Sequence, residues 1–393
     1  MSDSNKFETV RLEDVGEIIT GSTPPTQDES NYGGDVPFVR VSDMPEDSPY
    51  LKSTNKKLTV KGLNSVKNRE LTPGSVMISC IGSLGKTVVV EDTCVTNQQI
   101  NSIRPSEDVD VWFLYYKLSQ LQPKLEKIAG GTAQPIISKT KLSGIEIAIP
   151  ELHEQEKIGQ FLRSIDEKIE VNRAMGETLE DIAHAIYTSW FVDYEPYTSK
   201  EHPENHQSVS TLGEFINGYA FSQDKVTNSG EPVIKIRELK NGVSDNSDYY
   251  PEDENVDEKY HLSSGDVLFS WSASLDVFLW KKDVGLLNQH IYNVRPSEEF
   301  GREFVYFSLK QALAHLENRA DGTTMSHINR SDLDEVSVEC LTPEIRKRFT
   351  ETVRPLMNEI IRLDQENESL AELRDYLLPQ LLSGEVRLGG DNA

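Results

Sequence analysis

The chain has 393 residues, which is more than one ordinary domain contains, and 37% of them are hydrophobic, enough to form packed cores. It has no run of 18 apolar residues and no apolar leader, which argues against a membrane span or secretion and favours a cytoplasmic protein. Three cysteines (Cys80, Cys94 and Cys340) without metal-like spacing predict no metal site, and a net charge of −25 is unusual for a protein that binds DNA.

The acidic excess is spread unevenly along the chain. The net charge is −3 over residues 1–150, −6 over 151–200, −13 over 201–343 and −3 over 344–393. Net charge governs solubility and steering rather than fold. The excess therefore weakens a DNA-binding interpretation without excluding it.

The sequence contains itself twice. Residues 74–103 and 265–294 run in parallel at an offset of 191, which persists at Gly74/Gly265, Ser79/Ser270, Asn97/Asn288, Gln98/Gln289, Arg104/Arg295 and Gly131-Thr132/Gly322-Thr323. Upstream the register drifts, as loop-length differences would cause. A constant offset over this span indicates a tandem duplication.

Each copy begins with a unit of mixed α+β character. The short apolar runs 76–79, 87–90, 267–269 and 277–280 predict strands. Residues 111–128 and 302–318 carry apolar residues at helical spacing, and Pro123 is expected to break or kink the first of these helices.

Each unit is followed by a long heptad-patterned segment. The predicted seam contains Leu162, Ile165, Ile169, Leu179 and Ile186 in the first helix and Val353, Leu356, Ile360, Leu363, Leu370 and Leu377 in the second. The nearest partner for each apolar stripe is its own copy, so we expect an antiparallel pair with pseudo-twofold symmetry. Asn172, Gly176, Asn367 and Arg374 interrupt the seam, either to set its register or as simple irregularities.

The predicted fold is therefore α+β, with two similar domains separated by a long antiparallel two-helix coiled coil. The expected boundaries are 1–150 for the first domain, 151–195 for the first helix, 196–343 for the second domain and 344–393 for the second helix.

Several motifs point to one family. They are GEIITGSTP (16–24), NQQ (97–99), RPSE (104–107), GGTAQPIIS (130–138), AIYTSWFVDYEP (185–196) and LRDYLLPQLLSGEVRL (373–388). With the duplicated layout, they make the chain resemble, over essentially its whole length, the specificity subunit of type I restriction–modification enzymes.

The resemblance implies that each globular unit is a target recognition domain that binds one half of a bipartite double-stranded DNA sequence. It implies that the helices set the spacing and dock two adenine methyltransferase subunits, with restriction/translocase subunits joining for cleavage. S-adenosylmethionine, ATP and magnesium would then belong to the partner subunits, and this chain would bind no cofactor. Two alternatives remain: the recognition subunit of a fused methylase–nuclease system, and a coiled-coil adaptor between protein-binding domains.

The sequence predicts no catalytic residue. It has no G-x-G-x-x-G between a strand and a helix and no Asn-Pro-Pro-aromatic run. The segment Cys80–Thr87, CIGSLGKT, resembles a phosphate loop but has Cys80 where the first glycine is needed. A strand–turn–strand connection is the simpler interpretation, with Lys86 as a candidate phosphate contact.

In the first domain, residues 48–69 contain no Asp or Glu, and their basic side chains are candidate phosphate contacts: Lys52, Lys56, Lys57, Lys61, Lys67 and Arg69. A solvated lysine-rich loop is the alternative. Candidate base readers are Arg40, Ser42, Asn64 and Asn68.

The matching region of the second domain, residues 241–260, is strongly acidic. There the candidate DNA contacts are Lys235, Arg237, Lys240, Lys281, Lys282 and Arg330. Features that both copies share, such as Asn97/Asn288, are expected to be structural or to face phosphates rather than to read sequence, because the two domains should read different bases.

Overall fold

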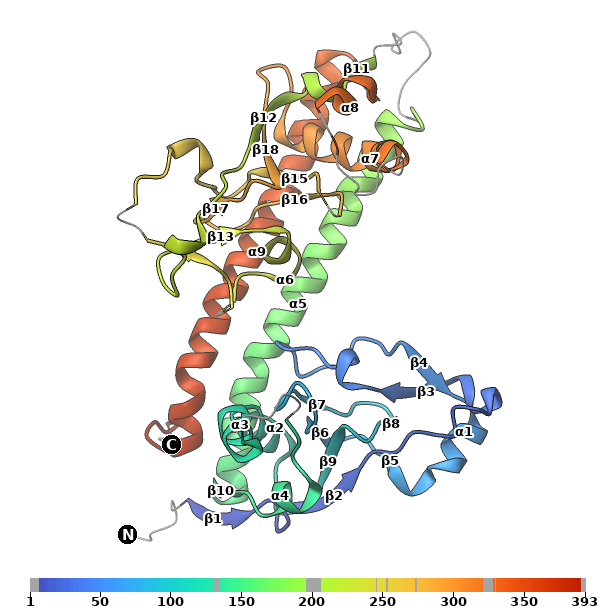
Figure 1. Cartoon of the computed structure of the whole chain (residues 1–393), viewed down its shortest axis with the longest axis vertical. Helices are drawn as coiled ribbons and strands as arrows, with labels where there is room; N and C mark the ends of the chain where they lie inside the picture. Colours follow the sequence, from blue (N-terminus) through green and yellow to red (C-terminus); the bar gives the residue numbers. More distant parts are fainter. Residues whose placement is uncertain are drawn as a thin grey trace. The chain divides into compact units, whose positions relative to one another are not determined.

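The computed structural model describes residues 7–130, 135–195, 206–244, 246–251, 254–272, 274–320, 328 and 330–389. The chain forms two compact units, Met1–Glu170 with Ser369–Ala393, and Val171–Glu368. Each unit contains one mixed α+β domain and part of two long helices, so the predicted fold class is confirmed (Figure 1). None of the helices in the described ranges is both long and apolar enough to cross a bilayer.

The described residues of the first unit form three sheets. Their strand orders are β1 (Glu8–Arg11)–β10 (Glu146–Ile149), then β2 (Gly16–Thr20)–β9 (Ile100–Pro105)–β6 (Val76–Ser79)–β7 (Thr87–Val89), then β4 (Lys56–Leu58)–β3 (Tyr32–Val39)–β8 (Cys94–Thr96)–β5 (Glu70–Leu71). The shorter helices are α1 (Val60–Ser65), α2 (Val111–Ser119), α3 (Gln122–Ala129) and α4 (Lys139–Ser143). Pro123 lies in the first turn of α3, so the break predicted there is confirmed.

The second unit repeats this plan. Its sheets are β11 (His206–Ser208)–β19 (Ser337–Glu339), then β12 (Gly213–Asn217)–β18 (Ile291–Pro296)–β15 (Val267–Ser270)–β16 (Asp276–Leu279), then β14 (Tyr249–Tyr250)–β13 (Glu231–Ile234)–β17 (Leu286–Leu287). Its shorter helices are α6 (Ile236–Asn241), α7 (Arg302–Ala320) and α8 (Arg330–Glu335).

The duplication extends to strand register. In the first unit Gly16 pairs with Pro105 and Thr20 with Asn101; in the second, Gly213 pairs with Pro296 and Asn217 with Tyr292. The one parallel pairing of strands found in the described part of each unit also recurs, as β3–β8 and β13–β17. Two copies of one topology are therefore present.

Two long helices, α5 (Leu152–Phe191) and α9 (Pro343–Ser383), follow the two domains. Within the second unit they run antiparallel: Asn172 donates a hydrogen bond to Asn367 at 2.9 Å, whereas further along α5 the ring of Tyr187 lies 5.8 Å from that of Phe349. The two asparagines that interrupt the heptads thus bond to each other.

The predicted seam residues are buried to different degrees. Six side chains are buried: Leu162, Ile165, Ile169, Val353, Ile360 and Leu363. Five are half-buried: Leu179, Ile186, Leu356, Leu370 and Leu377.

Aromatic packing joins the second domain to both long helices. Tyr187 and Phe191 of α5, Phe304 and Phe307 of α7 and Phe349 of α9 are each at most 1% exposed and belong to one core. Burying a side chain of this size contributes about 1.5–3 kcal/mol. The domain is therefore held on the helices by residues from three distant parts of the sequence.

In the first unit a buried ion pair joins the helices. Arg374 of α9 lies 2.6 Å from Asp166 of α5, with only 17% and 3% of the two side chains exposed. Tyr116 of α2 donates a hydrogen bond to the same carboxylate, and burial raises the pKa of this phenol, which keeps it a neutral donor. Arg374, which interrupts the heptad pattern, is thus matched by an acid opposite it.

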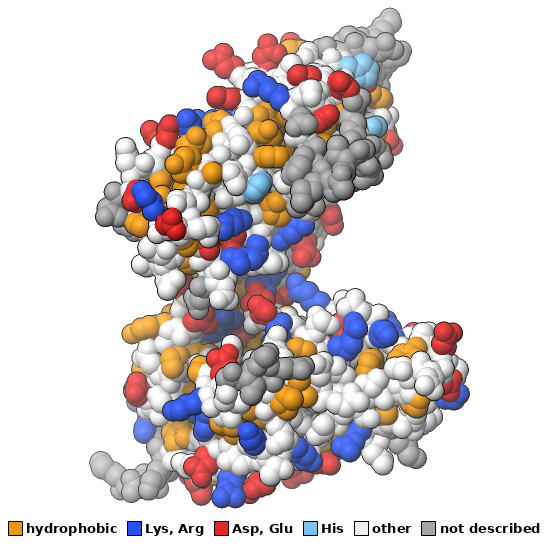
Figure 2. All heavy atoms as spheres, in the orientation of Figure 1, with side chains coloured by type: hydrophobic (Ala, Val, Ile, Leu, Met, Phe, Trp, Pro, Cys, Tyr) orange, Lys and Arg blue, Asp and Glu red, His pale blue; other side chains and the backbone are white. Residues whose placement is uncertain are grey.

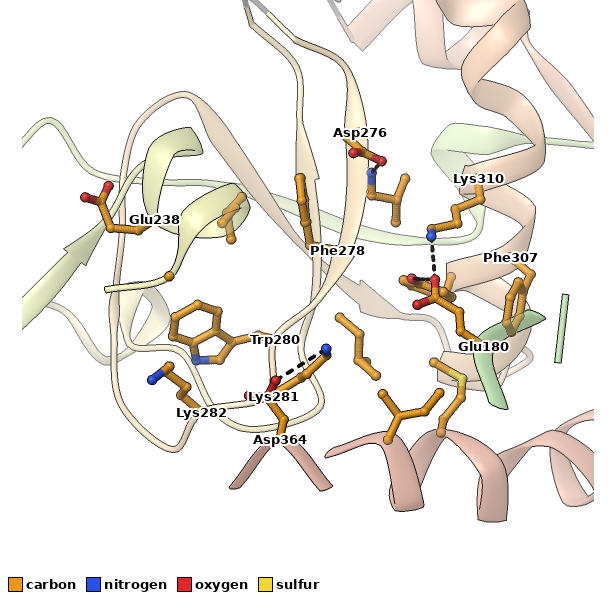
Figure 3. A pocket seen from close by; sticks show the side chains of 17 residues that line it. Glu180, Glu238, Asp276, Phe278, Trp280, Lys281, Lys282, Phe307, Lys310 and Asp364 are labelled. Atoms are coloured by element: carbon orange, nitrogen blue, oxygen red, sulfur yellow. Dashed lines mark hydrogen bonds and ion pairs between the residues drawn. The ribbon is translucent and has the colours of Figure 1, made fainter. Parts of the chain in front are cut away.

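In the second unit, the carboxylate of Glu180 on α5 lines a pocket of about 330 Å³ and, like Asp166 in the first unit, it bonds to a cation and to a tyrosine (Figure 3). It accepts hydrogen bonds from Lys310 at 2.5 Å and Tyr306 at 2.6 Å, both on α7. Burial alone would raise the pKa of Glu180, but these two bonds and the charge of Lys310 outweigh it and lower the pKa. Across the pocket Lys281 pairs with Asp364 of α9 at 3.5 Å. Charged groups around this pocket thus link the domain to both helices.

Replacing Arg374 by Leu should lower the free energy of unfolding by about 3–5 kcal/mol, because it leaves the Asp166 carboxylate buried without its cation. Adding Asp166→Asn should recover part of this loss, since an amide is neutral and still accepts from Tyr116. Denaturant unfolding measures both effects. Arg362→Leu, which removes exposed pairs with Glu359 and Glu366, is the control and should change little. Equal stability of the single and double variants would contradict the assignment.

Glu180 should stabilise the docking of α7 in a pH-dependent way. Because its pKa is lowered in the folded state, the stabilisation is complete above the ordinary carboxyl pKa and is lost as the pH falls through the lowered value. Hydrogen–deuterium exchange in α7 at pH 7 should therefore be faster in Glu180→Gln than in the wild type, and the difference should shrink near pH 4. Glu177→Gln, an exposed neighbour on α5, is the control. Unchanged exchange at pH 7 would refute this role.

Candidate nucleic-acid interface

The lysine-rich segment of the first domain does not form one continuous basic face. Lys61 lies 2.7 Å from Asp28, and its hydrogen bond lowers the pKa of that carboxyl to about 2. Lys56 sits over the ring of Tyr32, 5.4 Å from its centroid. Lys52 and Lys57 instead line a separate pocket of about 210 Å³ whose wall also contains acidic side chains.

The remaining candidates of the first domain differ in availability. Asn64, Asn68, Arg69 and Ser42 are exposed, whereas Arg40 is half-buried and pairs with Asp43 at 3.5 Å. The side chain of Lys67 lies outside the described residues. Lys52, Lys57 and Arg69 form no ion pair with the described part of the chain, so their charges are the most available to phosphates.

The segment 80–87 is a hairpin connection between the antiparallel strands β6 and β7, not the phosphate loop that it resembles. Lys86 is only 19% exposed and lies 3.1 Å from Glu46. It is thus held within the domain, with its charge already balanced.

Most basic candidates of the second domain are also paired. Lys235 pairs with Asp248, Arg237 with Glu238, Lys281 with Asp364 and Lys282 with Glu368. Lys240 donates a hydrogen bond to Ser274 at 2.7 Å. Arg330 is exposed at the start of α8. The DNA contacts predicted for this domain stay predictions, and the structure leaves Arg330 as the cation best placed to serve.

The shared Asn-Gln pair makes the same backbone contacts in both domains. Asn97 donates its backbone N–H to Val39, and Asn288 donates to Ile234. A Cβ on Gly21 would lie 2.1 Å from the Asn97 carbonyl oxygen, and one on Gly218 would lie 2.1 Å from that of Asn288. These contacts need glycine and support the structural role predicted for the pair. The other shared motif, Gly131-Thr132 and Gly322-Thr323, lies outside the described residues.

Close to these contacts the second domain has an aromatic residue, Trp271, that the sequence analysis did not single out. Trp271 follows β15, donates a hydrogen bond to Asn217 at 3.1 Å and lies against His290 and Tyr292. At the offset of 191, Trp271 corresponds to Cys80, a buried residue of the first domain. Comparing the two copies position by position would have identified this difference.

Acidic and basic side chains are interspersed on the visible face of each unit (Figure 2). Within the described residues, no three His, Cys, Asp or Glu side chains come together as a metal-binding group. The candidate side chains that remain exposed are amides and a few unpaired cations, which are groups that can contact base edges and phosphates.

Comparisons with known proteins agree with this interpretation. The model of the type I restriction modification DNA specificity domain matches the chain twice, at residues 4–181 and 204–371. The chain is 26% identical to the type I restriction enzyme MjaIX specificity subunit of Methanocaldococcus jannaschii, over 97% of this chain and 94% of that protein. It is 32% identical over 177 residues to the HindI specificity subunit of Haemophilus influenzae, covering 42% of this chain and 38% of that protein.

The fold is shared with a solved structure, the type I restriction–modification S subunit from M. genitalium, with a TM-score of 0.61 at 14% identity over 97% of both chains. Since the family model covers most of the sequence in two copies, the chain belongs to the family of type I restriction modification DNA specificity domains and supplies DNA sequence specificity in a type I system.

Proposed function

We propose that each domain binds one half of a bipartite double-stranded DNA target. The observation that carries this is that the strand register is duplicated while the surfaces differ: one scaffold presents two different sets of side chains. Shared features would position the protein on DNA, and divergent ones would read bases.

We assign methylation, translocation and cleavage of DNA to partner subunits. Methyl transfer to adenine, with S-adenosylmethionine, belongs to two methyltransferase subunits, and ATP- and magnesium-dependent translocation and cleavage belong to restriction subunits. This chain contributes binding and orientation alone. The purified chain should transfer no methyl groups to DNA, and adding the cognate methyltransferase should give sequence-specific adenine methylation; transfer by the chain alone would overturn the proposal.

An exposed apolar stripe on α5 supports a docking role for the helices. Val171, Met175 and Ile182 are 56%, 44% and 45% exposed, and their spacing of four and seven residues places them on one side of the helix. Exposed apolar side chains that line up in this way are typical of a partner-binding helix. We assign this stripe to a methyltransferase subunit.

Met175→Glu should therefore weaken copurification with the cognate methyltransferase by tenfold or more, because it places a charge in an apolar contact. Size-exclusion chromatography of the co-expressed subunits measures this. Glu177→Gln, about 200° around the helix from Met175, is the control. Undiminished complex formation by Met175→Glu and by Ile182→Glu would contradict docking on this stripe.

The unpaired cations of the first domain should determine the salt dependence of DNA binding. Each lost phosphate contact makes the negative slope of log K against log salt shallower by about 0.9, so replacing Lys52, Lys57 and Arg69 by Gln should reduce its magnitude by roughly one to three. Any duplex of about 30 base pairs serves as the probe, because phosphate contacts do not depend on sequence. Lys127→Gln on α3 is the control. An unchanged slope in the triple variant would show that these side chains do not meet DNA.

A further inference from the structure

Among the described residues of the second domain, few of the cations on which DNA readers usually depend are unpaired. Residues 201–343 have a net charge of −13. Besides the four pairs at its candidate residues, Lys225 is held by Glu254, Lys259 by Asp257 and Lys310 by Glu180. If this domain recognises half of the target, as proposed above, uncharged groups must supply most of the specificity.

Such groups lie together at one end of the sheet β12–β18–β15–β16. The indole Nε1 of Trp271 donates to the amide oxygen of Asn217 at 3.1 Å. The ring centroids of His290 and Tyr292 each lie 5.8 Å from that of Trp271. Asn217 and His290 are exposed and Trp271 is half-buried. Hydrophobic side chains are exposed on the visible face of this unit over these strands (Figure 2).

A cationic side chain, that of Arg330, lies near the same end of this sheet. The backbone N–H of Ile328 donates to the carbonyl of Trp271 at 3.1 Å, which brings the start of α8 beside the tryptophan. Arg330, two residues further on, is exposed. Burial raises the pKa of Tyr292, and the charge of Arg330 partly opposes this rise. A base edge and a neighbouring phosphate could thus be contacted from one surface.

The first domain has the same backbone here but different side chains. Cys80 N donates to the carbonyl of Gln99, as Trp271 N donates to that of His290. Thr20 donates a hydrogen bond to Asn101 at 2.7 Å, where the second domain has Asn217 beside Tyr292. Cys80 and Asn101 are buried, so no aromatic edge is presented. The scaffold is constant and this edge varies, as expected of positions that set specificity.

We propose that Trp271 and Asn217, supported by His290 and Arg330, form the surface with which the second domain reads its half of the DNA target. The indole fixes the amide oxygen of Asn217 and leaves the amide NH₂ group to donate to base acceptors in the major groove, such as guanine O6 and N7 or thymine O4. The apolar edge of Trp271 suits contact with a thymine methyl group.

The test uses the full chain in complex with its cognate methyltransferase and a library of duplexes with a randomised segment, sequenced for methylated adenine. Trp271→Ala and Asn217→Ala should each lower discrimination at one or two positions of one half-site by about fivefold or more and leave the other half-site unchanged. Trp271→Phe keeps the ring and loses the hydrogen bond to Asn217, so its loss should be smaller. Val284→Ala, an exposed substitution in the same unit, is the control and should leave both half-sites intact.

Two outcomes would overturn the inference. The first is that complexes of Trp271→Ala and of Asn217→Ala methylate the same sequence as the wild type and also unfold at the same temperature as the wild type. The other is an unaltered motif with reduced copurification of the methyltransferase, which would assign the edge to a protein partner. A wild-type complex without any sequence preference would instead refute the proposed function itself.

Discussion

The structure depends on the burial of domain residues against both long helices at once. In the second unit one core contains side chains from α5, α7 and α9, and in the first unit a core of the same kind includes Phe113, Leu162 and Leu381. These residues come from parts of the sequence as far as 268 positions apart (113 to 381). Neither helix could bury its apolar side alone, and neither domain has a complete core without them.

Polar groups then fix how each domain sits on its helices. The buried Asp166–Arg374 pair and the Asn172–Asn367 hydrogen bond join α5 to α9, and Glu180 joins α5 to α7. Apolar packing is non-directional, whereas a buried carboxylate accepts only partners in a defined position. Three of the four residues that interrupt the heptad pattern, Asn172, Asn367 and Arg374, therefore provide specific contacts, whereas Gly176 faces open space.

Much of the fold could be predicted, because local hydrophobic periodicity and the internal repeat indicate its elements. The strands around Val76 and Val267, the break before Pro123 and the two long helices follow from spacing and from proline chemistry. The pairing of Arg374 with Asp166 could not be predicted, because heptad positions mark burial and do not identify the partner across the seam.

The candidate site was harder to predict for an electrostatic reason. A run of lysines shows charge but not which ammonium groups have acidic neighbours. Lys61 and Lys282 pair with Asp28 and Glu368, and the sequence alone does not distinguish them from Lys57, whose charge is available to phosphates. The role of Trp271 could not be predicted from the sequence, because an isolated aromatic residue usually indicates core packing. Its significance arises from Cys80 occupying the same place in the other copy.

The central claim is that the two domains recognise DNA independently on one scaffold. The most direct measurement exchanges residues 196–343 for the corresponding segment of the MjaIX relative and maps methylated adenines in DNA modified by the resulting complex. The account predicts that one half of the recognised sequence changes and the other half stays as in the unaltered complex. A change in both halves, or in neither, would contradict it.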